Sequence, residues 1–185
     1  MSKRIKELLS QPGRTFNADE LSALAAYFRT VMFDTLHDRG TGHWGGAASS
    51  AELTTALYFN RLSIDPANPR WEDRDRVILS KGHASMNLYT ILAHRGFFPV
   101  EELSSFRKLD SRLQGNPCMN ELPGVDMSTG ALGHGLSVGL GMALAARLSK
   151  KSWWTYVISG EGCLNEGQSW EAIMKFKPES EDEME

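Results

Sequence analysis

The fold class follows from Trp153-Trp154-Thr155-Tyr156-Val157-Ile158-Ser159-Gly160-Glu161-Gly162, an aromatic and β-branched run that passes into a glycine-containing loop. The composition of this run predicts a strand over 153–158. A second apolar run, Val77-Ile78-Leu79, predicts a short buried strand that ends in the loop from Ser80 to His83. Helical patterns follow both runs, and this alternation predicts an α/β fold with a parallel sheet.

Six helices are expected around the two strands. The first is the clearest, because Asn17 followed by Glu20 forms a capping box ahead of apolar residues at helical spacing. A second capping box, Ser49 with Glu52, predicts another helix start, so residues 40–48 are expected to form a loop. The expected helices are 17–39, 49–58, 84–94, a short one after Pro99, the Gly- and Ala-rich segment 132–148, and a last one that carries Trp170, Ala172, Ile173 and Phe176.

Composition and charge limit the function classes. The 185 residues are 41% hydrophobic and 23% charged, which is typical of a globular domain. Five acidic groups in the last eight residues predict a disordered tail at 178–185 after a single domain at 1–177. A net charge of −3 argues against a nucleic-acid partner. No apolar run approaches the roughly 20 residues of a membrane span, and the N-terminus resembles no signal peptide, so we expect no membrane partner. Cys118 and Cys163 offer no disulfide framework, so we expect a reducing, cytoplasmic location.

Candidate site residues gather in glycine loops after the strands, where open parallel sheets bind ligands. Gly162 lets the backbone approach a phosphate, and the adjacent Glu161 can hold a divalent cation. Three of the five histidines, His43, His83 and His134, also lie in glycine loops. A single loop histidine is more often a surface residue, but three together predict a pocket in which neutral imidazoles donate to phosphate or accept a proton.

Several other reactive or aromatic residues have structural interpretations. Cys163 is expected to be a small packing residue, and neither cysteine of the chain has partners at zinc-ligand spacing. Ser49 and Ser50 are interpreted as helix caps, because no Gly-x-Ser-x-Gly elbow surrounds them. Trp153 and Trp154 are expected in the core or at an interface.

The glycine loops belong to a series of motifs that occur in a fixed order. The motifs are Gly42-His43-Trp44-Gly45-Gly46, Ser50-Ala51-Glu52-Leu53, Asp73-Arg74-Asp75-Arg76-Val77-Ile78-Leu79-Ser80-Lys81-Gly82-His83-Ala84-Ser85, Pro123-Gly124-Val125 with Ser128-Thr129-Gly130-Ala131-Leu132-Gly133-His134-Gly135-Leu136, and Gly160-Glu161-Gly162-Cys163-Leu164-Asn165-Glu166-Gly167-Gln168-Ser169-Trp170-Glu171-Ala172. With these motifs the chain resembles the N-terminal part of transketolase over 21–176, specifically the separately encoded N-terminal subunit of split bacterial transketolases.

This resemblance implies a three-layer α/β/α fold that binds thiamine diphosphate. The diphosphate and a Mg²⁺ or Ca²⁺ ion would lie at the end of the strand over 153–158, with Glu161 in the metal-ligand position. His83 would contact the diphosphate. The positions that the resemblance assigns to the cofactor are His83, Gly130, Ala131, Leu132, Gly160 and Gly162.

The resemblance also implies a reaction, the transfer of a two-carbon ketol unit from a ketose phosphate to an aldose phosphate. His43 matches a residue that contacts the sugar near its reacting carbon, so His43 and His83 are the candidate catalytic residues. The resemblance places Asn116 on the substrate side of the site, so Asn116 is the second candidate substrate residue beside His43. Sugar phosphates are therefore the expected small-molecule partners.

The chain departs from the family pattern in several places. Glu161 replaces an aspartate, Asn116 replaces a histidine and His134 replaces a glutamine. The family also has a later strand that ends in a metal-binding asparagine, and a pyrimidine-binding domain. We therefore expect a truncated chain whose sheet is incomplete at the C-terminus. Such a chain would need a complementary C-terminal transketolase subunit, in a homo- or hetero-oligomer.

Two other interpretations stay open. Glu161 and Asn116 also suit a truncated, non-catalytic paralogue that keeps the fold and acts only as a binding partner. Another thiamine enzyme, deoxyxylulose phosphate synthase, shares the first His-Gly loop, although residues 80–85 and 166–172 fit transketolase better.

Overall fold

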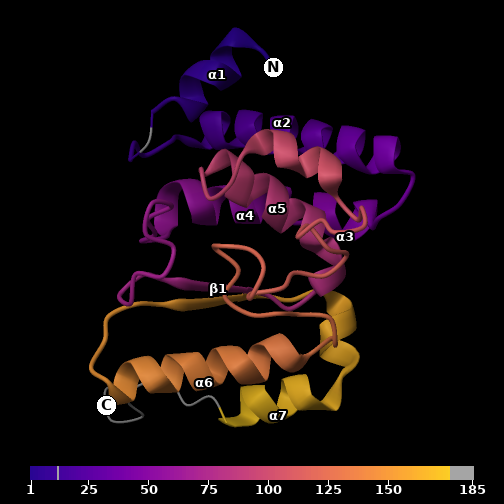
Figure 1. The fold of residues 1–185 in the computed structure, drawn as a ribbon. Helices are drawn as coiled ribbons and strands as arrows, with labels where there is room; N and C mark the ends of the chain where they lie inside the picture. The colour runs from indigo at the N-terminus through magenta and orange to yellow at the C-terminus, as the bar shows by residue number, and fades with distance from the viewer. Residues whose placement is uncertain (12, 176–185) are drawn as a thin grey trace.

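The computed structural model describes residues 1–11 and 13–175. They form three layers, with a parallel sheet between two layers of helices (Figure 1). Helices α1 to α5 lie on one side of the sheet, and α6 and α7 lie on the other. The predicted tail at 178–185 and the predicted helical residue Phe176 lie outside the described residues. The elements are α1 (Lys3–Leu9), α2 (Ala18–Arg39), α3 (Trp44–Ala48), α4 (Ala51–Ala56), the π-helical turn η1 (Leu57–Arg61), β1 (Arg76–Leu79), the 3₁₀ turn η2 (Gly82–Ala84), α5 (Ser85–His94), the 3₁₀ turn η3 (Val100–Ser105), α6 (His134–Leu148), β2 (Thr155–Ile158), the 3₁₀ turn η4 (Glu161–Asn165) and α7 (Gly167–Lys175).

The sheet confirms the predicted parallel α/β fold. Strand β1 pairs with β2 in parallel, with Arg76 opposite Thr155 and Leu79 opposite Ile158. The second strand begins at Thr155 rather than at Trp153 as predicted, although the Trp154 carbonyl still accepts a hydrogen bond from the Arg76 amide at 2.8 Å. Of the two positions predicted for Trp154, core or interface, its 62% exposure excludes the core, and the interface position stays a prediction.

Helix α2 has the predicted capping box. The Glu20 amide donates to the Asn17 side chain at 3.0 Å, and the Asn17 amide donates to the Glu20 carboxylate at 3.0 Å. These bonds satisfy amides that the first turn of a helix leaves without partners. The helix then buries Phe28 and Met32 against the rest of the core.

The predicted capping box of Ser49 with Glu52 is wrong, and so is the predicted loop over 40–48. Trp44–Ala48 form the short helix α3, and the Ser49 amide continues it by donating to the Gly45 carbonyl at 3.0 Å. Helix α4 therefore begins only at Ala51, and neither Ser49 nor Ser50 caps it with its side chain. The Glu52 carboxylate pairs with the Arg29 guanidinium instead.

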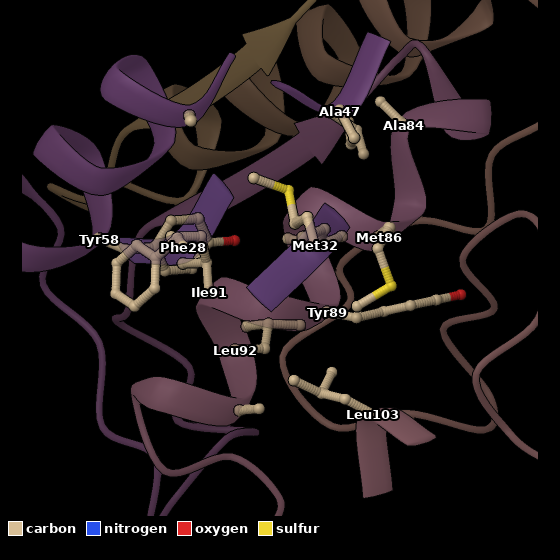
Figure 2. Close-up of a cluster of buried hydrophobic side chains, with 14 of the residues drawn as sticks. Phe28, Met32, Ala47, Tyr58, Ala84, Met86, Tyr89, Ile91, Leu92 and Leu103 are labelled. Carbon is tan, nitrogen blue, oxygen red and sulfur yellow. The ribbon is translucent and has the colours of Figure 1, made fainter. Parts of the chain in front are cut away.

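The main core lies between the sheet and helices α2, α4 and α5. Figure 2 shows Phe28 and Met32 of α2 packed near Tyr89 and Leu92 of α5, and all four side chains are buried. A buried polar contact also holds the layers together, because the Asn87 side chain donates to the Ala47 carbonyl at 2.8 Å. Helix α5 thereby fixes α3, which carries the first glycine motif.

On the other face, glycines let α6 approach the strands closely. This helix begins at His134, two residues later than predicted, after Gly133 with a φ of 84°. A Cβ at Gly135 would lie 2.5 Å from the Ser80 Cβ, and one at Gly139 would lie 2.4 Å from a Val157 methyl. Distances this short exclude a side chain, so glycine at both positions sets the spacing between α6 and the sheet. No helix in the described part of the chain is long and apolar enough to span a bilayer.

Candidate active site

A polar cavity of about 290 Å³ lies at the carboxyl ends of β1 and β2. This is the edge at which parallel sheets bind ligands, because the loops after neighbouring strands converge there. The cavity brings together five residues that the sequence predicts for the site: His83, Leu132, Gly160, Glu161 and Gly162. Its other lining residues are Gly45, Gly46, Ser49, Lys81 and Cys163.

His83 lies in η2, directly after β1, and faces the first glycine motif. Its ring and that of His43 are 5.4 Å apart between centroids, in an edge-to-face arrangement. A Cβ at Gly46 would lie 3.0 Å from the His83 Nε2 atom, so glycine at position 46 leaves room for this imidazole. Burial lowers the pKa of His83, and the neighbouring His43 and Lys81 lower it further against the opposing effect of Glu161. At neutral pH the ring is therefore uncharged and can both donate and accept a hydrogen bond.

Lys81 is a site residue for which the sequence alone gives no functional prediction. It is only 7% exposed, and its ammonium group donates to the Gly46 carbonyl at 2.9 Å and to the Ser49 hydroxyl at 3.1 Å. Burial lowers the Lys81 pKa, while the nearby Glu161 and Cys163 act in the opposite direction. Within residues 1–11 and 13–175 no carboxylate lies within ion-pair distance of Lys81. Its position in the loop after a predicted strand is the signal that could have identified it.

The wall after β2 contains one carboxylate and one thiol. Glu161 begins η4 and is exposed, whereas Cys163 is fully buried and its Sγ atom lies 3.6 Å from the Ser80 Oγ atom. The prediction that Cys163 is a packing residue is therefore confirmed. A Cβ at Gly162 would lie 3.3 Å from a Leu132 methyl, so the two loops meet closely here.

The chain matches a known protein family over most of its length. The family model described as "Transketolase, thiamine diphosphate binding domain" matches residues 21–176. The chain belongs to this transketolase family.

Relatives and solved structures agree with this assignment. The chain is 41% identical over 155 residues to the 6-deoxy-6-sulfo-D-fructose transketolase subunit SqwG of Clostridium sp. (strain MSTE9), covering 84% of this chain and 56% of that protein. It is 40% identical over 159 residues to transketolase 2 of Escherichia coli (strain K12), covering 80% of this chain and 24% of that enzyme. The structure of transketolase from Leishmania mexicana matches with a TM-score of 0.80 at 30% identity, covering 86% of this chain and 25% of that one. The chain thus spans about half the length of its subunit-type relatives.

The polar cavity has features that suit a diphosphate, such as that of thiamine diphosphate. Its walls include Gly46, Gly160 and Gly162, where the absence of a side chain leaves backbone open to a ligand. The buried Lys81 ammonium has no anionic partner among the described residues, and a diphosphate would supply one. The chemistry of the cavity therefore suits a phosphorylated ligand.

The cavity offers few ligands to a cation. Glu161 is the one carboxylate among the residues that line the cavity, and no group of three or more His, Cys, Asp or Glu residues in the described chain is arranged to hold a metal ion. A Mg²⁺ ion commonly uses one or two carboxylates, together with waters and phosphate oxygens. Glu161 is thus one candidate ligand for a cation that a bound diphosphate would share.

None of the remaining predicted residues lines the cavity. A Cβ at Gly82 would lie 3.0 Å from the Gly130 amide nitrogen, which shows how closely these two loops pack. The side-chain Nδ2 atom of Asn116 lies 3.6 Å from the position of a Gly130 Cβ, so Asn116 is adjacent to Gly130. Ala131 is exposed, and His134 is the exposed first residue of α6; neither lines the cavity. Of the three glycine-loop histidines only His83 lines the cavity, and its ring lies against that of His43.

Proposed function

We propose that this chain is the diphosphate-binding section of a transketolase-type enzyme. It would take part in the transfer of a two-carbon ketol unit from a ketose phosphate to an aldose phosphate. The observation that carries the proposal is the buried Lys81, which faces a glycine-walled cavity at the ends of both strands. Membership of the transketolase family supports it.

Thiamine diphosphate, when bound, supplies the carbanion chemistry of such a transfer, while the protein supplies binding, orientation and electrostatics. Lys81 and the neutral His83 would donate hydrogen bonds to the diphosphate, and the Gly160 and Gly162 backbone would approach it. Gly130, Ala131 and Leu132 would line the thiamine. Of these three residues only Leu132 lies in the cavity wall.

The metal and substrate roles are finer parts of the same proposal. Glu161 would ligate Mg²⁺ or Ca²⁺ through its carboxylate. His43, exposed beside His83, would contact a sugar phosphate near its reacting carbon, and Asn116 would hydrogen-bond the same substrate. We retain His43 and His83 as the catalytic residues.

The proposal includes a complementary partner chain. Relatives that match over about half of their length are named as subunits, including an apulose-4-phosphate transketolase subunit from Actinobacillus succinogenes, which is 40% identical over 157 residues. We therefore propose that this chain works with a C-terminal transketolase subunit, in a homo- or hetero-oligomer. The cytoplasmic location stays a prediction.

Calorimetry tests this proposal. Thiamine diphosphate is titrated with Mg²⁺ into the full chain, alone and mixed with a C-terminal transketolase subunit, and two-carbon transfer is then assayed in the mixture. We expect saturable binding in the mixture and transfer between a ketose phosphate and an aldose phosphate. Absence of binding in both samples would overturn the proposal.

Glu161 supports a second candidate, a non-catalytic paralogue that keeps the fold and binds a full-length relative. Its side chain is one methylene longer than the aspartate for which it stands, and Mg²⁺ tolerates poor octahedral geometry badly. Cofactor binding without any transfer activity in the reconstituted mixture would favour this candidate. Measurable two-carbon transfer would exclude it.

A further inference from the structure

A second cavity shares no lining residue with the first. It has a volume of about 450 Å³, is open to solvent on one side, and is lined by residues of α1, α2, η1, η3 and the C-terminal end of α5. Three aromatic rings, from Phe16, Tyr27 and Phe59, contribute to its wall. Ligand sites in proteins commonly have volumes of roughly 300–1,000 Å³, with apolar walls and a few polar groups.

Arg95 brings a positive charge to this apolar cavity. It caps the C-terminal end of α5, lines the cavity, and lies over the Phe59 ring at 5.3 Å from the centroid. Its Nε–H group is buried without an acceptor, and in the described part of the chain no carboxylate lies within ion-pair distance of its guanidinium. Burial lowers the Arg95 pKa because the charge loses solvation.

His94, the neighbour of Arg95, adds no charge of its own. Its Nδ1 atom lies 2.8 Å from the Thr90 carbonyl oxygen, which can only accept, so Nδ1 carries the proton. Its Nε2 atom then accepts from the Tyr27 hydroxyl at 3.4 Å, and burial lowers the His94 pKa. The other charged groups at the cavity are the Glu101 carboxylate and the α-amino group of Met1, both on exposed residues.

We propose that this cavity binds a small carboxylate with an aromatic body. The carboxylate would pair with the Arg95 guanidinium, and the ring would pack against Phe16, Tyr27 and Phe59. A planar guanidinium matches a carboxylate with two parallel hydrogen bonds, and an arginine beside an aromatic ring keeps part of its charge out of water. Such a ligand satisfies both features of the site, the unpaired cation and the apolar wall.

The first experiment compares matched probes on the full chain. Isothermal calorimetry measures 2-naphthoate and its neutral analogue 2-naphthamide, and amide NMR spectra show where each one binds. We expect saturable binding of 2-naphthoate with shifts at residues of this cavity, and an affinity for 2-naphthamide at least about ten-fold weaker. Equal affinities, or no saturable binding of 2-naphthoate, would overturn the proposal.

Variants assign the effect to the site. Arg95→Gln should weaken 2-naphthoate binding by about ten-fold or more. Arg112→Gln is the matched control, because Arg112 also lies over a phenylalanine ring, that of Phe98 at 5.6 Å, but lies outside this cavity and pairs with Glu102. Unchanged affinity in Arg95→Gln, or an equal loss in the control, would contradict the proposal.

Two further variants keep the test valid if Arg95→Gln does not fold. Leu9 lines the cavity and is half-buried, so Leu9→Trp should fill the space and abolish binding. Glu101→Gln removes a like charge and should tighten binding of the anion. Thermal unfolding of each variant confirms that it is folded. Wild-type affinity in Leu9→Trp, or weaker binding in Glu101→Gln, would contradict the proposed site.

Discussion

The Lys81 ammonium group lies 2.9 Å from the Gly46 carbonyl oxygen, although 35 residues separate the two along the chain. This bond joins the loop after β1 to the short helix α3 at the wall of the polar cavity. It places a buried cation between the first glycine motif and the loop that carries His83. The cofactor site that we propose depends on this relationship.

Replacing Lys81 tests that dependence. Lys81→Met keeps the length of the side chain and removes its charge, so we expect affinity for thiamine diphosphate with Mg²⁺ to fall by about ten-fold or more, as for a lost charge-assisted hydrogen bond. Calorimetry with the C-terminal subunit present measures this change. Lys151→Met is the control, because Lys151 pairs with Asp73 at the surface, and it should bind like the wild type. Equal affinities in the wild type and Lys81→Met would contradict the role of this lysine.

The lowered His83 pKa gives a prediction for pH dependence. Because the folded-state pKa lies below the usual value of about 6.5, the unfolded chain takes up this proton more readily. The contribution of the neutral His83 ring to the free energy of unfolding is therefore fully present above about pH 6.5. It is lost as the pH falls from there through the folded-state pKa. NMR titration of the ring, assigned with His83→Asn, should give a value below the usual one. Titration at or above that value would contradict the burial that we describe.

The metal role of Glu161 is tested by shortening its side chain. Glu161→Asp restores the aspartate of the family pattern, so we expect tighter binding of thiamine diphosphate with Mg²⁺, by about ten-fold if Mg²⁺ geometry limits the wild type. EDTA should weaken binding in both proteins. The proposed ligand role is wrong if Glu161→Asp binds no better and EDTA has no effect on either protein.

Two glycines of α6 form a matched pair for stability. A Cβ at Gly139 would lie 2.4 Å from a Val157 methyl, whereas one at Gly141 would meet no atom within 4 Å. Gly139→Ala should lower the free energy of unfolding by about 1–3 kcal/mol through overpacking. Gly141→Ala should raise it by about 0.5–1 kcal/mol through helix propensity. Urea unfolding measures both, and equal effects would show that α6 does not pack on β2 as described.

Local patterns in the sequence account for much of the fold. Continuous runs of apolar, aromatic and β-branched residues predict both strands, and the pair Asn17 and Glu20 predicts the start of α2, because these signals act over a few residues. Helix α3 is different, since its sequence contains Gly45 and Gly46, which disfavour a helix. Tertiary hydrogen bonds from Lys81 and Asn87 to carbonyls of this helix accompany it, and a local pattern cannot reveal them.

The candidate site, too, could be predicted only in part from the sequence. The family resemblance predicts His83, Glu161 and Gly162, and the structure places all three around one cavity. The sequence does not single out Lys81, because a lysine in a loop is normally solvated. Only tertiary packing buries this one. Packing also decides that Ala131 stays outside the wall while its neighbour Leu132 enters it.

An NMR titration tests the proposed cofactor site most directly. Thiamine diphosphate with Mg²⁺ is added to the isotope-labelled full chain, with the unlabelled C-terminal transketolase subunit present, and amide and histidine-ring resonances are followed. We predict saturable shifts at Gly160, Gly162 and the His83 ring, with Lys81→Met reducing the affinity. Saturable binding that leaves these resonances unmoved would place the cofactor elsewhere and contradict the proposed site.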